Sequence, residues 1–448
     1  MAPKSESPRT PREAAFTGIC RMLKDKTYSN LLLDSLLRQL PDKRSRAFAS
    51  SLFYGVLERE ITLQHIIEVY SGRPVPKLDP EVAAALELGL YQLGWMDAVP
   101  DSAAVNESVN LVKNSHKKSA AGFVNGILRR FIREGKQLPL PEGPIERASV
   151  LYSMPGWILS LWRRDYGEET AVKLAESCLG RPPLQLRVNT LKADAGQVEA
   201  ELKTAGFYAF PHPVVPDALT AREGSPAGPP AVTEGRCYIQ DAASQLAAWA
   251  VRPEPEETVF DLCAAPGGKS FTMAQMMEDK GKLLAFDLHP SRVKLIADGA
   301  ARLGIHCITA AAGDAGVFNP ELGLADRVLC DVPCAGLGVI RRKPEIRYKP
   351  LASVRELPRL QLTILENGAA LVKPGGLLLY ATCTLNPREN GEVAQRFLDK
   401  HPEFEPAPFS LPGIERLVEE PSHTLTMLPM GGGSDGFFAA RFRRKGDL

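Results

Sequence analysis

The 448-residue sequence lacks an apolar run of membrane-spanning length, because no stretch approaches the roughly 18 apolar residues that a spanning helix needs. It also lacks the apolar segment of a secretory signal, since its N-terminus reads MAPKSESPRTPR. Its eight cysteines include no CxxC pair, which argues against a zinc ribbon or a thioredoxin-like dithiol. Cysteines this sparse do not form a disulfide scaffold. The sequence therefore predicts free thiols in a reducing, cytoplasmic compartment, with no membrane association and no metal.

The sequence also lacks a large excess of either positive or negative side chains. The chain has 54 basic and 53 acidic side chains, for a net charge of +1. This balance excludes a protein that coats polyanions through a global basic excess, but it leaves local basic patches open. Residues 1–150 hold 21 basic and 17 acidic side chains, whereas the remainder holds 33 and 36. We therefore expect any nucleic-acid contact to depend on the N-terminal part or on local clusters.

The length corresponds to several domains, at roughly 100–200 residues per domain. Residues 1–12 are rich in Pro, Ser and basic side chains, which predicts a disordered tail. From residue 13 onward apolar side chains recur at helical spacing, as Leu32, Leu36 and Leu40 do. This pattern predicts a bundle of five or more helices over 13–140, which ends in a linker rich in Pro and Gly.

The hydrophobic pattern changes after residue 140. Within 141–235, Leu184, Leu186 and Val188 alternate with polar residues, which is typical of a half-buried strand in a small α+β module. Over 236–448 short apolar runs alternate with helical stretches and loops, which predicts a Rossmann-like α/β domain with a parallel sheet. The runs span 258–263, 283–287, 306–309, 328–331 and 377–382. Ligands in such sheets bind at the carboxyl ends of the strands.

The first of these strands runs into the sequence DLCAAPGGKS, residues 261–270. A Gly-Gly turn after a strand lets the backbone approach a ligand and directs the N–H groups of the next helix toward it. A phosphate-binding P-loop is excluded, because Cys263 stands where that motif needs its first glycine. An NAD-type fingerprint is not favoured either, since Gly267-Gly268 lacks the G-x-G-x-x-G spacing. A plain tight turn remains the alternative to a ligand loop.

Carboxylates follow the next two strands. Asp287 closes the second strand, where a carboxylate can accept hydrogen bonds from both ribose hydroxyls of a nucleoside-type cofactor. Gly313-Asp314 follows the third strand, where an adenine would lie. Either residue alone is more often a helix N-cap. Their succession from one strand end to the next favours a ligand site.

Two cysteines follow the fourth and fifth strands, in Asp331-Val-Pro-Cys334 and in Tyr380-Ala-Thr-Cys383-Thr. A cysteine is ordinarily a small buried hydrophobe, but a thiol beside a helix N-terminus or a cation has a lowered pKa and becomes a nucleophile. The basic run 341–343 follows Cys334 and is either a solvated charged face or a contact for RNA phosphates.

The motifs DLCAAPGGKS, DVPCAGLGVIRRKPEI, YATCTLNPREN and GSDGFFAARF together resemble the RNA cytosine-5 methyltransferases. More narrowly, the chain is similar to the bacterial 16S rRNA enzymes of the RsmB/Sun/Fmu type. The resemblance spans nearly the whole chain. It implies a NusB-like helical RNA-binding domain at 13–140, a small RNA-contacting α+β module at 141–235 and an S-adenosylmethionine-dependent methyltransferase domain at 236–448.

The resemblance also implies residue roles. Cys383 is the expected nucleophile toward C6 of the cytosine, Cys334 the second cysteine, and Asp331 a group that binds the edge of the base. The expected ligands of S-adenosyl-L-methionine are Cys263, Ala264, Ala265, Pro266, Gly267, Gly268, Lys269, Asp287, Asp314 and Asp331. The chain departs from the family at Ala335 and Leu337, where the usual Ser and Thr hydroxyls near the base are missing.

The expected substrate is small-subunit ribosomal RNA, with its target base unstacked, and no obligate protein partner is inferred. Two alternatives stay open at this point. One is the same chemistry on transfer RNA or DNA. The other is a non-catalytic RNA-binding or antitermination factor, although a vestigial domain need not keep both cysteines, the strand-end acids and the Gly-Gly-Lys loop.

Overall fold

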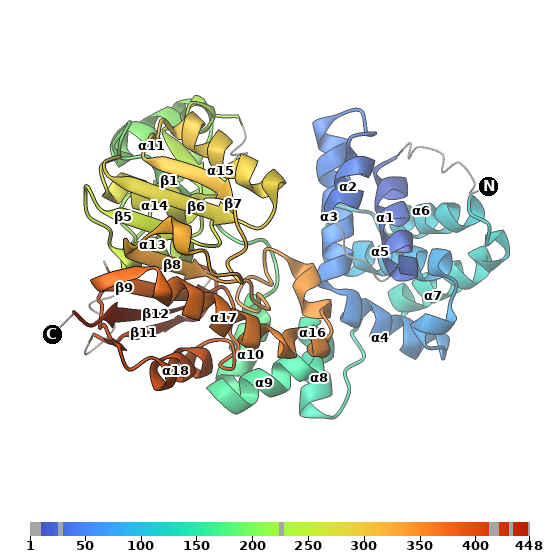
Figure 1. The fold of residues 1–448 in the computed structure, drawn as a ribbon. Coiled ribbons are helices and arrows are strands. Elements are labelled where there is room, and N and C mark those ends of the chain that lie inside the picture. The colour runs from blue at the N-terminus through green and yellow to red at the C-terminus, as the bar shows by residue number, and fades with distance from the viewer. Residues whose placement is uncertain (1–9, 26–29, 224–227, 412–420, 430–432, 447–448) are drawn as a thin grey trace, which may run out of the picture. The chain divides into compact units, whose positions relative to one another are not determined.

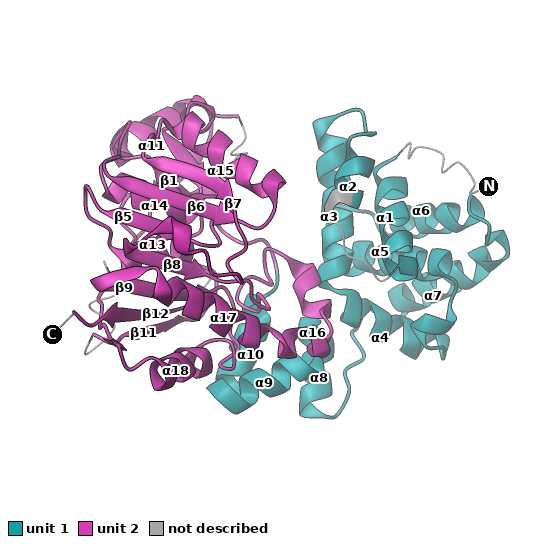
Figure 2. Cartoon of the chain, in the orientation of Figure 1, with its two compact units in different colours: residues 1–179 teal, residues 180–448 magenta. Residues whose placement is uncertain are grey.

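The computed structural model describes residues 10–25, 30–223, 228–411, 421–429 and 433–446. The chain forms two compact units, residues 1–179 and 180–448 (Figure 2). Most of the predicted tail lies outside the described residues, and the first helix already begins at Pro11. None of the helices in the described ranges is long and apolar enough to cross a membrane.

The first unit is built from α-helices joined by short turns (Figure 1). The helices are α1 (Pro11–Asp25), α2 (Asn30–Leu37), α3 (Lys43–Glu58), α4 (Glu60–Ser71), α5 (Pro80–Trp95), α6 (Asp101–Lys113), α7 (Ala121–Arg133), α8 (Pro144–Tyr152), α9 (Gly156–Tyr166) and α10 (Glu168–Ser177), with the 3₁₀ helices η1 (Val75–Lys77) and η2 (Lys118–Ala120). The helical bundle predicted over 13–140 is confirmed by α1–α7, whereas α8–α10 lie in the range 141–235 that was predicted as the small α+β module.

Helix α5 forms the centre of this bundle. It packs against α1, α3, α4, α6 and α7. A helix that is surrounded by others buries apolar side chains on all sides, and the residues from Val82 to Leu90 are buried without interruption. The peripheral helix α7 shows the opposite pattern, because it buries Val124, Leu128 and Phe131 along one stripe and exposes Arg129 and Arg133 on the other side.

The second unit begins with a small four-stranded antiparallel sheet in the order β2-β3-β1-β4. Its elements are β1 (Leu184–Val188), α11 (Ala195–Thr204), β2 (Tyr208–Pro211), β3 (Ala218–Glu223), α12 (Pro230–Thr233) and β4 (Cys237–Ile239). Leu186 and Val188 pack against α11 as the alternation predicts. The other face of β1 is buried too, since Gln185 and Arg187 are almost fully buried, and the Arg187 guanidinium donates to the carbonyl of Pro216 (2.8 Å).

The large sheet has the order β10-β12-β9-β8-β5-β6-β7, and β11 pairs with β12. Its strands are β5 (Thr258–Asp261), β6 (Lys282–Asp287), β7 (Ile308–Ala312), β8 (Ala325–Asp331), β9 (Val372–Thr382), β10 (Phe404–Pro406), β11 (Thr424–Met427) and β12 (Phe437–Arg444). Strands β5 to β9 are parallel, as predicted. Beyond the predicted parallel strands, β10, β11 and β12 add an antiparallel edge.

Helices cover both faces of this sheet. The remaining elements are α13 (Ala242–Val251), α14 (Gly268–Met276), α15 (Pro290–Leu303), η3 (Pro320–Leu322), η4 (Pro344–Tyr348), α16 (Leu351–Arg355), α17 (Leu357–Ala370) and α18 (Gly391–Lys400). Helices α13, α14 and α15 pack on one face, against Val259 and Leu283, and α17 and α18 pack on the other, against Phe260 and Val328. The doubly wound order makes β5 the neighbour of both β6 and β8, and ligands of such sheets bind where the strand order reverses.

Candidate active site

The turn between β5 and α14 requires glycine at position 267. Its φ is +107°, and a Cβ there would lie 2.3 Å from the ring of Phe271. The turn is closed by the Gly267 N–H, which donates to the Ala264 carbonyl (2.8 Å), and is fastened to β6 by the Ala264 N–H, which donates to the Phe286 carbonyl (2.7 Å). The first N–H groups of α14 therefore point out at the carboxyl edge of the sheet, where they have no partner within the helix.

The predicted cofactor carboxylates lie at the ends of the next two strands. Asp287 ends β6, is 5% exposed, accepts a hydrogen bond from the His289 N–H (3.1 Å) and pairs with Arg292 (3.1 Å). Asp314 follows β7 and is exposed, and it accepts from the Gly316 N–H (2.8 Å). Both carboxylates thus stabilise local turns, and both remain on the edge that carries the glycine turn.

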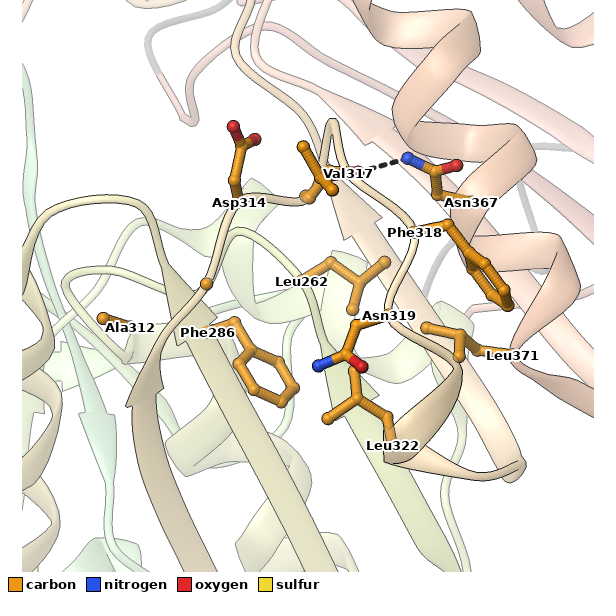
Figure 3. A pocket seen from close by; sticks show the side chains of 12 residues that line it. Leu262, Phe286, Ala312, Asp314, Val317, Phe318, Asn319, Leu322, Asn367 and Leu371 are labelled. Atoms are coloured by element: carbon orange, nitrogen blue, oxygen red, sulfur yellow. Dashed lines mark hydrogen bonds between the residues drawn. The ribbon is translucent and has the colours of Figure 1, made fainter.

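A cavity of about 430 Å³ opens beside Asp314 (Figure 3). Leu262, Phe286, Leu322 and Leu371 give it an apolar wall, and Asp314 lies at one end with its carboxylate directed away from that wall. No α-helix connects β7 to β8, which are joined by a loop and η3, and α17 contributes Asn367 to the lining of the cavity. The site therefore offers an apolar hollow next to a hydrogen-bonding acid.

Lys269 and Asp331 connect the glycine turn to the fourth parallel strand. Asp331 ends β8, and its carboxylate accepts a hydrogen bond from the Lys269 ammonium at 2.7 Å. Burial alone would lower the pKa of Lys269, but the ion pair with Asp331 raises it overall, so the side chain stays charged. Behind the pair, burial raises the pKa of Asp261 to about 7, although this carboxyl accepts from the Ser270 hydroxyl (2.7 Å).

The two strand-end cysteines meet across this edge. Cys334 follows β8 and Cys383 follows β9, the parallel neighbour of β8, and their sulfurs are 3.2 Å apart. Either thiol can be the donor at this distance. A hydrogen bond from Cys334 lowers the pKa of Cys383, against the effect of burial, and Lys269 lowers that pKa further. The same hydrogen bond and burial raise the pKa of Cys334. Within the pair, Cys383 is therefore the sulfur that ionises first.

Backbone contacts fasten the two cysteine loops together and to the C-terminal strand. The Gly338 N–H donates to the Cys383 carbonyl (3.0 Å), and the Gly436 N–H donates to the Gly338 carbonyl (2.8 Å). A Cβ on Gly338 would lie 2.2 Å from the Gly436 carbonyl oxygen, so only glycine permits this approach. Phe437 then starts β12 with its ring centroid 5.9 Å from the Lys269 ammonium. Gly436 and Phe437, from the motif GSDGFF, thus contact the Cys334 loop and Lys269, so the motif belongs to the same site as the cysteines.

The three side chains of the basic run 341–343 have different environments, which the sequence did not reveal. Arg342 is neither a solvated charge nor a phosphate contact, because it pairs with Asp241 and Asp435 at 2.6 Å each. The Arg341 guanidinium donates to the Gly180 carbonyl (3.4 Å), whereas Lys343 is exposed and lowers the pKa of Cys383. Within this run, Lys343 alone keeps the role of a local cation near the thiols.

Two further features differ from expectation or were missed. Ala335 and Leu337 are almost fully buried, so the positions where the family has hydroxyls face the interior of the protein in this structure. Asp261, Glu389 and Asn390 are buried around the site, and no sequence pattern had singled them out for a role. The sequence could have indicated them, since all three residues lie inside the motifs DLCAAPGGKS and YATCTLNPREN.

Comparison with known families agrees with this arrangement of the chain. Residues 248–443 match the family described as 16S rRNA methyltransferase RsmB/F. Residues 9–133 match the NusB family, and residues 154–227 match the ferredoxin-like domain of RsmF/B-like methyltransferases. The helical bundle, the small sheet and the large sheet thus each have a known counterpart.

Similar proteins match nearly the whole chain. The probable ribosomal RNA small subunit methyltransferase B of Bacillus subtilis is 39% identical over 97% of this chain and 99% of its own, and that of Synechocystis is 36% identical over the same shares. The crystal structure of PH0851 aligns over 98% of this chain and 99% of its own with a TM-score of 0.79 and 27% identity. The chain therefore belongs to the RsmB/F family of 16S rRNA methyltransferases.

Proposed function

We propose that the protein transfers a methyl group from S-adenosylmethionine to C5 of a cytosine in 16S rRNA through a covalent bond between Cys383 and C6. The observation that carries this proposal is the pair of sulfurs 3.2 Å apart, and we assign Cys334 as the donor because a hydrogen bond from Cys334 lowers the pKa of Cys383. That hydrogen bond lowers the pKa of one thiol at the expense of the other, and a covalent mechanism needs one thiolate nucleophile.

The cofactor site is the edge formed by residues 263–269, Asp287, Asp314 and Asp331. The residues fit an adenosyl group with an amino-acid end. The N–H groups of α14 suit a carboxylate, Asp287 suits the ribose hydroxyls, and the apolar cavity beside Asp314 suits a flat ring. When bound there, the cofactor supplies an electrophilic methyl group on a sulfonium. Asp331, held by Lys269, borders both this site and the thiols.

The thiol chemistry follows from the weakness of C5 as a nucleophile. The Cys383 thiolate forms a bond to C6, and the ring becomes an enamine that is nucleophilic at C5. With the cofactor bound, C5 would accept the methyl group, and the bond from that methyl to the sulfonium sulfur would break with its electron pair returning to the sulfur. Asp331 accepts a hydrogen bond from the exocyclic amine and orients the base. The C5 proton then leaves with the help of Cys334 or a group beside it. The electron pair of the C5–H bond restores the ring double bond and expels the Cys383 sulfur from C6.

The predicted domains span 13–140, 141–235 and 236–448, and the first two hold the RNA. In the helical bundle, Lys118, Arg129 and Arg133 are exposed cations. In the small sheet, Tyr208 and Phe210 on the edge strand β2 are 45% and 42% exposed, and the Arg222 guanidinium lies 4.8 Å from the Phe210 ring centroid. Exposed aromatic rings and arginine on a sheet suit stacking with unpaired RNA bases.

The cofactor assignment is tested with Asp287→Ala. This change leaves the ribose hydroxyls without an acceptor, so we expect S-adenosylmethionine binding to weaken by roughly 1–3 kcal/mol in calorimetry. Asp298→Ala is the matched control, because Asp298 is an exposed acid on α15 that pairs with Lys294. Equal affinities of the Asp287 and Asp298 variants would remove the ribose role.

The covalent mechanism is tested with the two cysteines one at a time. Cys383→Ala should abolish the methylated position in bisulfite sequencing of 16S rRNA and should form no covalent complex. Cys334→Ala should still attack and transfer the methyl group but release RNA slowly, so a denaturant-stable RNA adduct should accumulate on gels. Cys307→Ala, immediately before β7, is the control. An adduct with Cys383→Ala instead would assign the nucleophile to Cys334.

The pH dependence of alkylation reports the hydrogen bond between the thiols. Because the pKa of Cys383 is lowered, its thiolate should react with iodoacetamide at a pH below that of an ordinary cysteine. In Cys334→Ala the S–H donor is gone, and burial and Asp331 then raise the pKa of Cys383, so the alkylation profile should move to higher pH. Peptide mass spectrometry resolves Cys383 from the other cysteines. An unchanged profile contradicts the assigned donor.

The RNA-binding role of the helical bundle is tested with Lys118→Gln, Arg129→Gln and Arg133→Gln combined. Each cation that no longer neutralises an RNA phosphate should flatten the dependence of log affinity on log salt by roughly one unit, while cofactor affinity stays the same. Lys294→Gln and Lys400→Gln, at exposed cations of the second unit, serve as controls. An unchanged salt dependence in the triple variant would show that this face of the bundle does not bind phosphates.

A further inference from the structure

Two adjacent buried residues, Glu389 and Asn390, lie directly before helix α18. The Glu389 carboxylate is fully buried and accepts three hydrogen bonds. One oxygen accepts from the Ala335 N–H (2.8 Å) and from the Gln361 side-chain amide (2.9 Å), and the other accepts from the Asn386 amide (2.8 Å). The Ala335 hydrogen bond matters because Ala335 is the residue after Cys334, so the carboxylate holds the loop that carries this thiol.

The neighbouring Asn390 holds the other thiol loop in the same way. Its amide oxygen accepts from the Thr382 hydroxyl (2.6 Å), and its amide nitrogen donates to the Thr384 carbonyl (2.9 Å). Thr382 and Thr384 are the two residues that flank Cys383. Asn390 therefore clamps the backbone on both sides of the proposed nucleophile.

The dipeptide is itself anchored from two directions. The Tyr380 hydroxyl donates to the Glu389 carbonyl, and the Gln361 amide that binds the Glu389 carboxylate also donates to the Pro333 carbonyl (3.0 Å). Helix α18 follows at once and buries Phe397 completely in the core on that face of the sheet. Each residue bonds a different loop, so loss of either side chain changes the position of one sulfur relative to the other.

We propose that Glu389 and Asn390 are positioning residues that place the two thiols independently, Glu389 for Cys334 and Asn390 for Cys383. The inference rests on the proposed covalent mechanism, in which Cys383 acts first and Cys334 acts at release. Loss of the Glu389 clamp affects the release step, whereas loss of the Asn390 clamp affects the attack on C6. A purely structural role would lower both steps together.

Charge and geometry at Glu389 are separated by two conservative variants. Glu389→Asp keeps the charge but is one methylene shorter, so the carboxylate no longer reaches the Ala335 N–H. We expect it to accumulate the denaturant-stable RNA adduct, as Cys334→Ala does, with release slowed by tenfold or more and adduct formation little changed. Glu389→Gln keeps the length and one acceptor oxygen, and its release should stay within a few-fold of the wild-type rate.

The matched variants for the other clamp and for the helix complete the test. Asn390→Ala should slow adduct formation by tenfold or more in single turnovers and should not accumulate adduct. Glu392→Asp and Glu392→Gln change an exposed carboxylate in the first turn of α18 and should match the wild type. Unchanged S-adenosylmethionine affinity in calorimetry shows that each variant folds, because none of these residues belongs to the cofactor site.

The outcomes separate this inference from the mechanism on which it rests. If Cys334→Ala forms no adduct, the covalent mechanism fails. If Cys334→Ala forms the adduct but Glu389→Asp behaves as the wild type, the positioning role of Glu389 is overturned. The role is also overturned if Glu389→Gln is the variant that accumulates adduct, because charge rather than reach would then control release. Equal slowing of attack and release in the Asn390 and Glu389 variants contradicts independent placement of the two thiols.

Discussion

The parallel pairing of β8 with both β5 and β9 is the constraint on which the site depends. The pairs Asp261↔Leu329 and Asp331↔Ala381 align the ends of three strands that are far apart in the chain. The glycine turn, Asp331, Cys334 and Cys383 therefore project from one edge. A change of register by one residue would turn every side chain of a strand to the opposite face, so the apolar cores on both faces of the sheet also protect the geometry of the site.

The pKa values of the side chains at this edge depend on individual neighbouring groups rather than on the net charge of the protein. Lys269 is kept charged by Asp331, and it in turn lowers the pKa of Cys383. The hydrogen bond between the thiols makes the two cysteines unlike, although both are half-buried and lie in similar loops. The arrangement supports two roles for one residue type, because the sulfur that receives the hydrogen bond ionises more easily than the sulfur that donates it.

Most strand ends of the site followed from apolar runs, since β6 ends at Asp287 and β8 at Asp331 as expected. The prediction for the third strand, 306–309, was too early in the sequence, because β7 spans Ile308–Ala312. The residues of β7 are mostly alanine, so the strand carries little apolar signal. The partners of Arg342 could not be foreseen, because Asp241 and Asp435 lie about a hundred residues away on either side. The domain boundaries at 140 and 235 remain predictions.

The sequence by itself determined the classes of the elements and the chemistry available, because helical spacing, strand–loop–helix alternation and the DLCAAPGGKS and cysteine motifs are local patterns. Only the tertiary structure decided that the two thiols lie 3.2 Å apart, that Arg342 is an internal ion-pair partner, and that Glu389 and Asn390 hold the two thiol loops. The physical reason is that a pKa, a buried ion pair and a hydrogen-bonded clamp depend on contacts between segments distant in sequence. The order and register of the strands bring those segments together.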